Sequence, residues 1–474
     1  MDTRPLLQPL SIAERGLFPL VVLTACILRF WALGEWSLWE DEETTIYFSQ
    51  NLDKWFAKVS PVYFHPLAAI YELAGVSVWT GRAYSAVFGI ATVIAVYYGT
   101  RMHIGHLAAV TASALLTVNL GHLFWSQSIR YYAMALFFQS ASMFCFLHGF
   151  ERRKPVCIVA SSVLWALALL SHMSAILLAP VYVAYAALSL FPLRGKRQAI
   201  REHVVALVVF GVVAAGFLSL WNFVLQTQVA IQGDSEYSSP THILLTIAAY
   251  FGIPVIALAA VGTFLSRSTS VGTRQLLALG GSIPVAELIV IAQLKLVPTV
   301  TWYYGLVALV PLCCLSGLAI EELSRRRRVW TLFAALGVAF AYYGVFVAAY
   351  FGPMHGDRPR WREGVEFVRE QRRSADAADA VEIFATVPGV VEFYLGVDPA
   401  RTMNEEVVKA MPSAPPAAHA AGARWFLVKA SHVTPEYDAW FRKHCVHLAG
   451  FEAKTGPRDR TVHVYYSAPS RRER

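Results

Sequence analysis

The chain has 474 residues, of which 56% are hydrophobic and only 15% are charged, and its formal net charge is +8. Such an apolar composition excludes an ordinary soluble enzyme and is typical of a polytopic membrane protein.

About eleven apolar runs are long enough to form membrane-spanning helices. The first run is not a cleavable signal, because it is long, continues through Arg29 into an acidic cluster and lacks a cleavage site flanked by small residues. The expected spans cover residues 17–34, 82–100, 106–121, 132–150, 156–171, 174–191, 203–225, 243–265, 275–294, 301–320 and 329–351.

Basic residues gather in alternate loops between these spans, as in the stretches 152–154, 194–201 and 325–328. By the positive-inside rule these loops and the N-terminus are cytoplasmic. Residues 35–81, 122–131, 226–242 and 295–300 and the C-terminal residues are then extracytoplasmic. We therefore expect a multi-pass protein of the cell inner (plasma) membrane. The positive charge reflects this topology and does not indicate nucleic-acid binding.

Five of the six cysteines fall within expected spans, and Cys445 lies in the expected external domain. Cysteines inside spans behave as small apolar residues. Their spacing fits neither a disulfide framework nor a metal-binding motif.

The first external loop begins with four consecutive acidic residues, Glu40 to Glu43. Clustered carboxylates repel one another and anionic lipid headgroups, so a cation, a ligand or chemistry usually holds them together. The alternative is a solvated loop that stops the preceding helix. Later in this loop, His65 before Pro66 either positions a ligand or ends a helix.

The external turn between the third and fourth spans contains Gln127, Arg130, Tyr131 and Tyr132. An arginine that enters a membrane helix costs about 2.5–3.5 kcal/mol unless it snorkels or meets an anion. A guanidinium beside amide and hydroxyl donors suits a phosphate or pyrophosphate. Snorkelling to the interface is the alternative. Arg82 and His172 add polar groups at the same membrane level.

Glu287 lies inside the expected ninth span, where an ionised carboxylate is costly. A functional interpretation is a proton path or a contact with an acceptor. A protonated or hydrogen-bonded residue in a helix interface is the alternative.

From residue 352 the composition becomes that of a soluble domain. We expect helices at 359–373 and 435–444, strands at 381–386, 424–429 and 461–467, and an irregular connection at 410–422. The chain is therefore divided into a transmembrane catalytic domain, residues 1–351, and a small extracytoplasmic α/β domain, residues 352–474.

Four motifs occur in a fixed order over residues 15–190. They are Leu-Arg-Phe-Trp-x-Leu-Gly at the end of the first span, Ser-Leu-Trp-x-Asp-Glu, His-Pro, and Ser-Gln-x-x-Arg-x-Tyr. In this order the chain resembles the C-type glycosyltransferases. More narrowly, it is similar to the branch that contains protein O-mannosyltransferases and lipid A aminoarabinose transferases.

The resemblance implies a polyprenyl-phosphate sugar donor in the outer leaflet and an acidic catalytic base after the first helix. Asp41 would be the base and Glu42 its neighbour. The acceptor would be a hydroxyl of an envelope lipid, polysaccharide or protein. Arg130 would hold the donor phosphate, and His65 would line the site. Beyond the resemblance, we expect Gln127, Tyr131, Arg82 and Lys295 to contact the phosphate and Trp39, Glu43, His172 and Tyr303 to line the substrate.

Two positions depart from the family pattern. Many relatives have a glutamate where this chain has Ser128, so a second acid in that turn is unsupported here. Many also have an arginine just before the tyrosine that opens the late helix, where this chain has Thr301 and Trp302. Lys295, a turn or two earlier, is a candidate to replace that arginine as a second phosphate ligand.

The resemblance implies no cofactor, although the acids at 41–43 also have the chemistry to hold a divalent cation. Two other classes fit parts of the pattern, namely a transporter or flippase of lipid headgroups and a non-catalytic relative that binds polyprenyl lipids. Against a transporter, the polar groups gather at one membrane face and paired repeats are nearly absent.

Overall fold

The computed structural model describes residues 12–190, 238–265, 269–295, 300–374, 382–396, 408–415, 423–455 and 458–468, and a few positions between 204 and 215. The chain divides into two compact units. The helical unit comprises Met1–Trp31, Lys58–Pro66 and Ala83–Phe346, and the α/β unit comprises Ala32–Ala57, Leu67–Arg82 and Val347–Arg474. The acidic segment therefore groups with the C-terminal residues, although spans flank it in the sequence.

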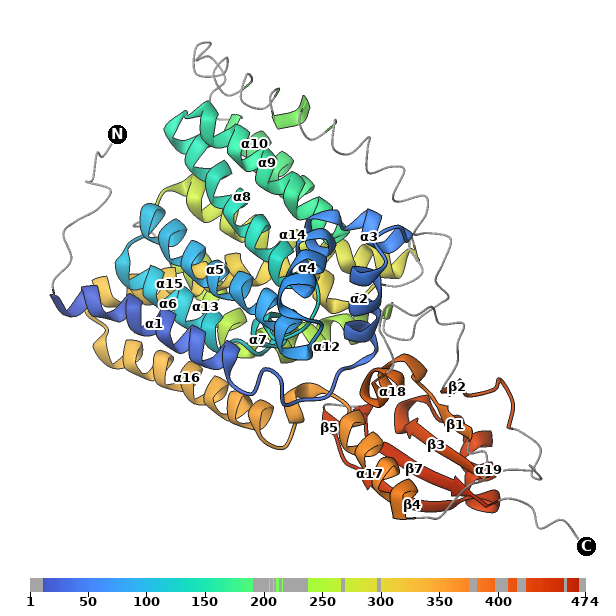
Figure 1. The fold of residues 1–474 in the computed structure, drawn as a ribbon. Coiled ribbons are helices and arrows are strands. Elements are labelled where there is room, and N and C mark those ends of the chain that lie inside the picture. The colour runs from blue at the N-terminus through green and yellow to red at the C-terminus, as the bar shows by residue number, and fades with distance from the viewer. Residues whose placement is uncertain are drawn as a thin grey trace, which may run out of the picture. The chain divides into compact units, whose positions relative to one another are not determined.

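Apolar helices form the larger unit (Figure 1). In chain order the helices that contribute to it are α1 (Ile12–Phe30), α5 (Val78–His103), α6 (His106–Val118), α7 (Leu120–Ser126), α8 (Tyr132–Arg152), α9 (Pro155–Ser171), η1 (Met173–Leu178), α10 (Ala179–Leu190), α12 (Pro240–Phe251), α13 (Ile253–Leu265), α14 (Val271–Gln293), η4 (Trp302–Ala308), α15 (Leu309–Arg325) and α16 (Val329–Phe351).

Within the described residues, five helices are long and apolar enough to cross a membrane: α5, α8, α14, η4 continued by α15, and α16. Two further spans are broken, since α6 and α7 are bent by 63° and α12 and α13 by 89°. Three shorter apolar helices cover Gly16–Phe30, Pro155–Ser171 and Met173–Ser189. These positions coincide with the expected spans other than 203–225. That span lies outside the described residues, apart from isolated positions, so the count of about eleven stays a prediction.

Small residues let helices of this unit approach one another closely. A Cβ atom at Gly317 of α15 would lie 2.2 Å from the Ala108 carbonyl oxygen of α6. A Cβ atom at Gly262 of α13 would lie 2.0 Å from the Leu315 carbonyl oxygen. Close packing through small residues is how helices associate where lipid removes the hydrophobic driving force.

The α/β unit contains a five-stranded sheet with the order β2-β1-β3-β7-β4. The first three strands in this order are parallel, and β7 is antiparallel to β3 and β4. A separate antiparallel pair joins β5 to β6. The strands are β1 (Glu382–Ala385), β2 (Lys409–Ala410), β3 (Arg424–Lys429), β4 (Val446–Phe451), β5 (Lys454–Thr455), β6 (Arg458–Asp459) and β7 (Val462–Ser467).

Helices cover both faces of this sheet. Phe426 of β3 packs with Tyr437 and Phe441 of α19 (Pro435–His444). Leu427, the next residue of β3, points to the other face, where α17 (Trp361–Ser374) places Gly364 close to it. The alternation of side chains along β3 therefore gives the sheet two buried faces.

Residues 35–81, the loop expected to be external, are mostly helical, contrary to the expectation of a loop. They form α2 (Glu40–Gln50), α3 (Trp55–Val59) and α4 (Pro61–Ala74). Four acidic residues occupy the first turn of α2. Acidic residues at this end of a helix are favoured because its exposed N–H groups and dipole are positive.

The expected elements of the C-terminal domain are confirmed, including β3 with the predicted bounds. Part of the expected connection at 410–422 lies outside the described residues. The helix α18 (Pro388–Leu395), the strand β4 and the two-residue strands β2, β5 and β6 were missed. β4 is an edge strand with several exposed side chains and a shift of register between His447 and Ala449. It therefore lacks the alternation that marks a half-buried strand.

Candidate active site

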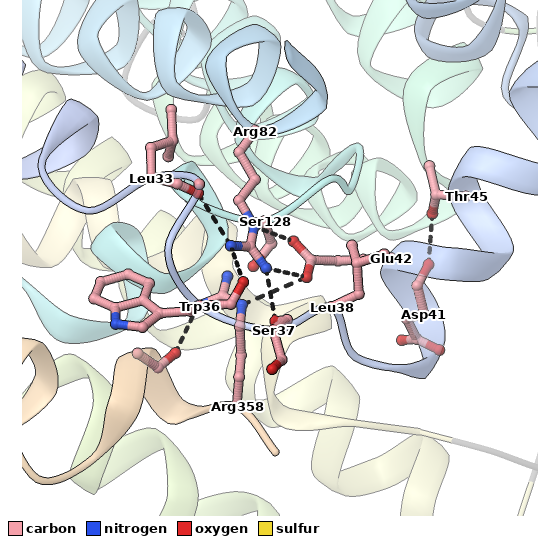
Figure 2. A network of polar contacts seen from close by, with 12 residues as sticks. Leu33, Trp36, Ser37, Leu38, Asp41, Glu42, Thr45, Arg82, Ser128 and Arg358 are labelled. Carbon is pink, nitrogen blue, oxygen red and sulfur yellow. Dashed lines mark hydrogen bonds and ion pairs between the residues drawn. The ribbon is translucent and has the colours of Figure 1, made fainter. Parts of the chain in front are cut away.

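The acidic helix α2 places its four carboxylates in different surroundings of the α/β unit. Consecutive residues of a helix point in directions about 100° apart. In Figure 2 the Glu42 side chain points toward two arginines, whereas the Asp41 carboxylate points away from them. Asp41 is half-buried, and Thr45 donates its hydroxyl to the Asp41 backbone carbonyl at 2.7 Å.

Glu42 is completely buried in an ion-pair network. Arg82 of α5 donates to both of its carboxylate oxygens, from Nε at 2.8 Å and from Nη2 at 2.6 Å. Nε of Arg358 lies 3.5 Å from Glu42 Oε2 (Figure 2). Both arginines are also fully buried. A buried carboxylate requires such partners, because an unpaired charge away from water is very costly.

All five N–H groups of Arg82 donate hydrogen bonds to residues 33–42. Besides the two bonds to Glu42, Nη1 donates to the carbonyls of Leu33 and Trp36, both at 3.0 Å, and Nη2 donates to Ser37 at 2.9 Å. A guanidinium has five N–H donors. In this arrangement Arg82 holds the turn before α2, and the N–H donors that a phosphate would need are already hydrogen-bonded within the protein.

The outer two acids of the cluster face the C-terminal elements. Glu40 forms an ion pair with Lys429 of β3, and His432 Nε2 lies 3.7 Å from the same carboxylate oxygen. Glu43 faces α18, where a Cβ atom at Gly389 would lie 2.6 Å from its carboxylate. The pKa of Glu43 is raised to about 7, mainly by burial and also by the nearby Glu392 carboxylate, while a hydrogen bond with Thr44 opposes the rise.

Arg130 lies in the helical unit, at the turn between α7 and α8, and is 6% exposed. Its Nη2 donates to the Tyr131 hydroxyl at 2.9 Å. Its guanidinium carbon lies 4.6 Å from the centre of the Tyr131 ring and 5.8 Å from that of Tyr132. The Ser85 hydroxyl of α5 donates to the Arg130 carbonyl at 3.3 Å. The cation is thus held against two aromatic faces.

His172 stacks on Tyr131, with ring centres 4.6 Å apart and planes 15° apart. The Ser174 backbone N–H donates to His172 Nδ1 at 3.1 Å. Because Nδ1 accepts this hydrogen bond, the neutral ring carries its proton on Nε2. Tyr132 joins this group to Tyr303, whose ring centre lies 4.9 Å away. The predicted residues Arg130, Tyr131, His172 and Tyr303 are therefore neighbours in one cluster.

Gln127 serves the end of α1. Its side-chain amide nitrogen lies 3.0–3.2 Å from the carbonyls of Leu28, Arg29 and Trp31. The last carbonyls of a helix have no intrahelical partner, so a side-chain donor there satisfies them. Gln127 thereby joins the turn that carries Arg130 to the end of the first helix.

The remaining predicted residues lie at separate places. His65 is exposed on α4, next to Tyr63 and Phe64, whose rings lie 5.9 and 6.5 Å from that of Tyr131. Lys295 is exposed after the end of α14, with a φ of 49°. Trp39 is half-buried and precedes the first residue of α2.

All six cysteines are free. Over the residues that the structure describes, no three His, Cys, Asp or Glu side chains gather in a way that could hold a metal ion.

Comparison with known proteins begins with a family model described as dolichyl-phosphate-mannose-protein mannosyltransferase, which matches residues 58–221. No curated protein matches the sequence. Among solved structures, ArnT from Cupriavidus metallidurans in the apo state is 15% identical, with a TM-score of 0.60 over 97% of this chain and 100% of that one. The chain has the fold of the C-type glycosyltransferases.

Other structures with this fold agree. ArnT bound to undecaprenyl phosphate is 14% identical, with a TM-score of 0.58 over 96% of this chain and 99% of that one. The oligosaccharyltransferase of Archaeoglobus fulgidus in the apo form is 14% identical, with a TM-score of 0.51 over 81% of this chain and 63% of that one. The resemblance to C-type glycosyltransferases and the fold class predicted from the sequence are confirmed.

Arg358, Tyr132 and Tyr304 were missing from the predicted site. Tyr304 lies beside His172, with ring centres 5.2 Å apart. The two tyrosines follow predicted site residues directly, and that adjacency could have indicated them. Arg358 follows the last span, and nothing local in the sequence links it to Glu42.

Proposed function

We propose that the protein is an integral membrane glycosyltransferase that moves a sugar from a polyprenyl-phosphate donor to a hydroxyl of an envelope acceptor, in the inner membrane. The observation that carries this proposal is the fold match to ArnT over nearly the whole of both chains, since one ArnT structure is bound to undecaprenyl phosphate. The family model over residues 58–221 supports the same reaction class.

Asp41 is the proposed catalytic base. In the reaction the acceptor oxygen forms a bond to the anomeric carbon, the bond from that carbon to the phosphate oxygen breaks, and polyprenyl phosphate leaves with the electron pair. The acceptor's proton passes to a carboxylate. A single displacement of this kind inverts the anomeric centre. Asp41 is half-buried in the first turn of α2, and its carboxylate points away from the two arginines, which supports this role.

Arg130 is the proposed ligand of the donor phosphate. Its guanidinium and the Tyr131 hydroxyl supply the charge and hydrogen bonds that a departing phosphate needs. His172, as a neutral ring protonated on Nε2, adds a donor without adding charge. Tyr303 supplies an aromatic wall, and Lys295 is a second cation of the same unit.

The other predicted residues have supporting roles in this proposal. Glu42 and Arg82 hold the start of α2, and Gln127 holds the turn before Arg130. Trp39, Glu43 and His65 line the path of the substrates.

The decisive experiment is Asp41→Asn, which keeps the size of the side chain and removes its ability to accept a proton. We expect transfer of a tritiated hexose or pentose from undecaprenyl phosphate to native membrane acceptors to fall by about 10²–10⁴-fold. Retention of undecaprenyl phosphate, measured by native mass spectrometry, should not change.

Glu40→Gln is a control in the same helical turn and should keep most of the activity. If the acids hold a divalent cation, several variants should fail together and added cation should partly restore them. Full transfer by Asp41→Asn would sink the base assignment and most of the case for this reaction. Movement of the intact lipid across vesicle membranes without sugar transfer would favour a transporter.

A further inference from the structure

The turn that precedes α2 is held by residues that follow the last span. Arg362 donates from Nη1 to the Glu35 carbonyl at 2.9 Å and from Nη2 to the Gly34 carbonyl at 2.8 Å. Its backbone N–H donates to the Ser37 hydroxyl at 3.0 Å. The Leu38 N–H donates to the Tyr394 hydroxyl of α18 at 2.7 Å. Residues 34–38 therefore have hydrogen-bond partners on both α17 and α18.

Arg358 extends this attachment to α2 itself. It is fully buried, with Nη1 donating to the Gly356 carbonyl at 2.6 Å and to the Tyr350 hydroxyl at 3.3 Å. Its guanidinium lies 5.7 Å from the Trp36 ring, and Nε faces the Glu42 carboxylate (Figure 2). Four contacts thus fix the direction of this side chain.

Glu42 does not need Arg358 as its counter-charge. Arg82 already binds both carboxylate oxygens and leaves the pair neutral. Arg358 is a second buried guanidinium beside this pair, and burying a further charged group costs desolvation energy. Because Arg82 already neutralises Glu42, the position of Arg358 beside this carboxylate needs another explanation.

We propose that Arg358 is a positioning residue for the acidic helix, which makes the segment after the last span part of the catalytic apparatus. Arg358 lies 3.5 Å from Glu42, which directly follows Asp41 in the first turn of α2, so the ion pair sets where the adjacent Asp41 points. The proposal rests on the proposed function, because it assumes that the orientation of Asp41 governs transfer.

The test compares Arg358→Gln and Arg358→Lys in the full-length protein in detergent or nanodiscs. Arg358→Gln should lower kcat for the tritiated undecaprenyl-phosphate sugar by about 10²-fold, because a misplacement near 1 Å costs about that much. The donor KM and retention of undecaprenyl phosphate should stay unchanged. Arg358→Lys keeps the charge without the planar fork and should restore part of kcat.

Hydrogen–deuterium exchange supplies the structural readout. Peptides from residues 36–50 should exchange faster in Arg358→Gln, while peptides from 424–429 should not change. The matched control is Arg424→Gln, which removes the arginine of a β3–β1 pair, 3.1 Å from Glu382. This control should leave both kcat and the exchange of residues 36–50 as in the wild type.

Two results would overturn the positioning role. One is a wild-type kcat in Arg358→Gln, with or without faster exchange in α2. The other is a raised donor KM with unchanged kcat, which would make Arg358 a binding residue. If Arg358→Gln is not recovered folded, Arg358→Lys decides, since a lowered kcat at unchanged KM supports the role and a wild-type kcat refutes it.

Asp41→Asn, assayed alongside, separates this inference from the proposed function. If Asp41→Asn is inactive and Arg358→Gln is fully active, only the positioning role fails. If Asp41→Asn is fully active, the proposed function fails whatever the Arg358 variants do.

Discussion

At the scale of single residues, the fold uses two of its buried charged groups, Glu42 and Arg130, in different ways. Glu42 forms ion pairs with Arg82 and Arg358, two arginines of the α/β unit. Arg130 lies against the Tyr131 and Tyr132 rings of the helical unit. Aromatic faces attract a guanidinium and hold its plane in one orientation. They therefore offset part of the desolvation free energy that burying the cation costs.

Arg130→Ala should abolish retention of undecaprenyl phosphate. Removing one partner of a buried charged hydrogen bond costs about 2–5 kcal/mol of binding. Arg130→Lys should recover only part, because an ammonium cannot form the bidentate contact. Native mass spectrometry of the purified variants measures both. Arg152→Ala, at the opposite end of α8, is the control. Wild-type lipid retention in Arg130→Ala would refute the phosphate role.

Glu43→Gln should stabilise the protein at pH 8 and leave its stability unchanged near pH 4. The pKa of Glu43 is raised in the folded state to about 7. Folding is therefore favoured by the neutral form below the unfolded pKa, and this advantage is lost as the pH rises through 7. The gain at pH 8 should be on the order of 1–3 kcal/mol. Thermal unfolding at both pH values checks it, and equal stabilisation at both would contradict it.

At the scale of elements, the helical unit depends on close helix crossings and the α/β unit on charged and hydrogen-bonded contacts. Gly317 of α15 faces the backbone of α6, which cannot move aside as a flexible side chain can. Residues 34–43 are held by α17, α18 and β3 through Arg362, Tyr394 and Lys429. Disturbing these two kinds of contact should therefore have different consequences.

Gly317→Ala should destabilise the helical unit by about 1–3 kcal/mol, as overpacking of a tight contact does. The added methyl would lie 2.2 Å from the Ala108 carbonyl oxygen. Gly337→Ala is the matched control, because nothing lies within 4 Å of its Cβ position and alanine favours a helix. Thermal unfolding in detergent micelles compares the two. Equal effects would show that the α6–α15 crossing is less tight than described.

At the scale of the whole molecule, the expected topology has a cytoplasmic N-terminus and an extracytoplasmic C-terminal domain. The basic loops at 152–154 and 325–328 carry this prediction. A C-terminal alkaline phosphatase fusion should be active and a green fluorescent protein fusion dark. The opposite pattern would mean that the number of spans differs from eleven by an odd number.

Much of the fold follows from local sequence. Apolar runs predict the helices because a segment in lipid must satisfy its backbone polar groups by internal hydrogen bonds, and short runs of β-branched and aromatic residues predict β1, β3 and β7. Elements without a strong hydrophobic period were not predicted. One is α2, whose first turn consists of four acidic residues and is therefore typical of a loop. The proximity of Arg130, Tyr131 and His172 could be predicted, because all three lie at the ends of spans on the same side of the membrane.

The sequence by itself determined a multi-pass membrane protein, its C-terminal α/β domain and the residue types of a candidate site. Only the tertiary structure decided which charges pair. Glu42, Arg82 and Arg358 lie far apart in the chain, and neither composition nor spacing links them. A buried ion pair depends on where whole elements pack, since a charge away from water must find whichever partner the fold brings to it.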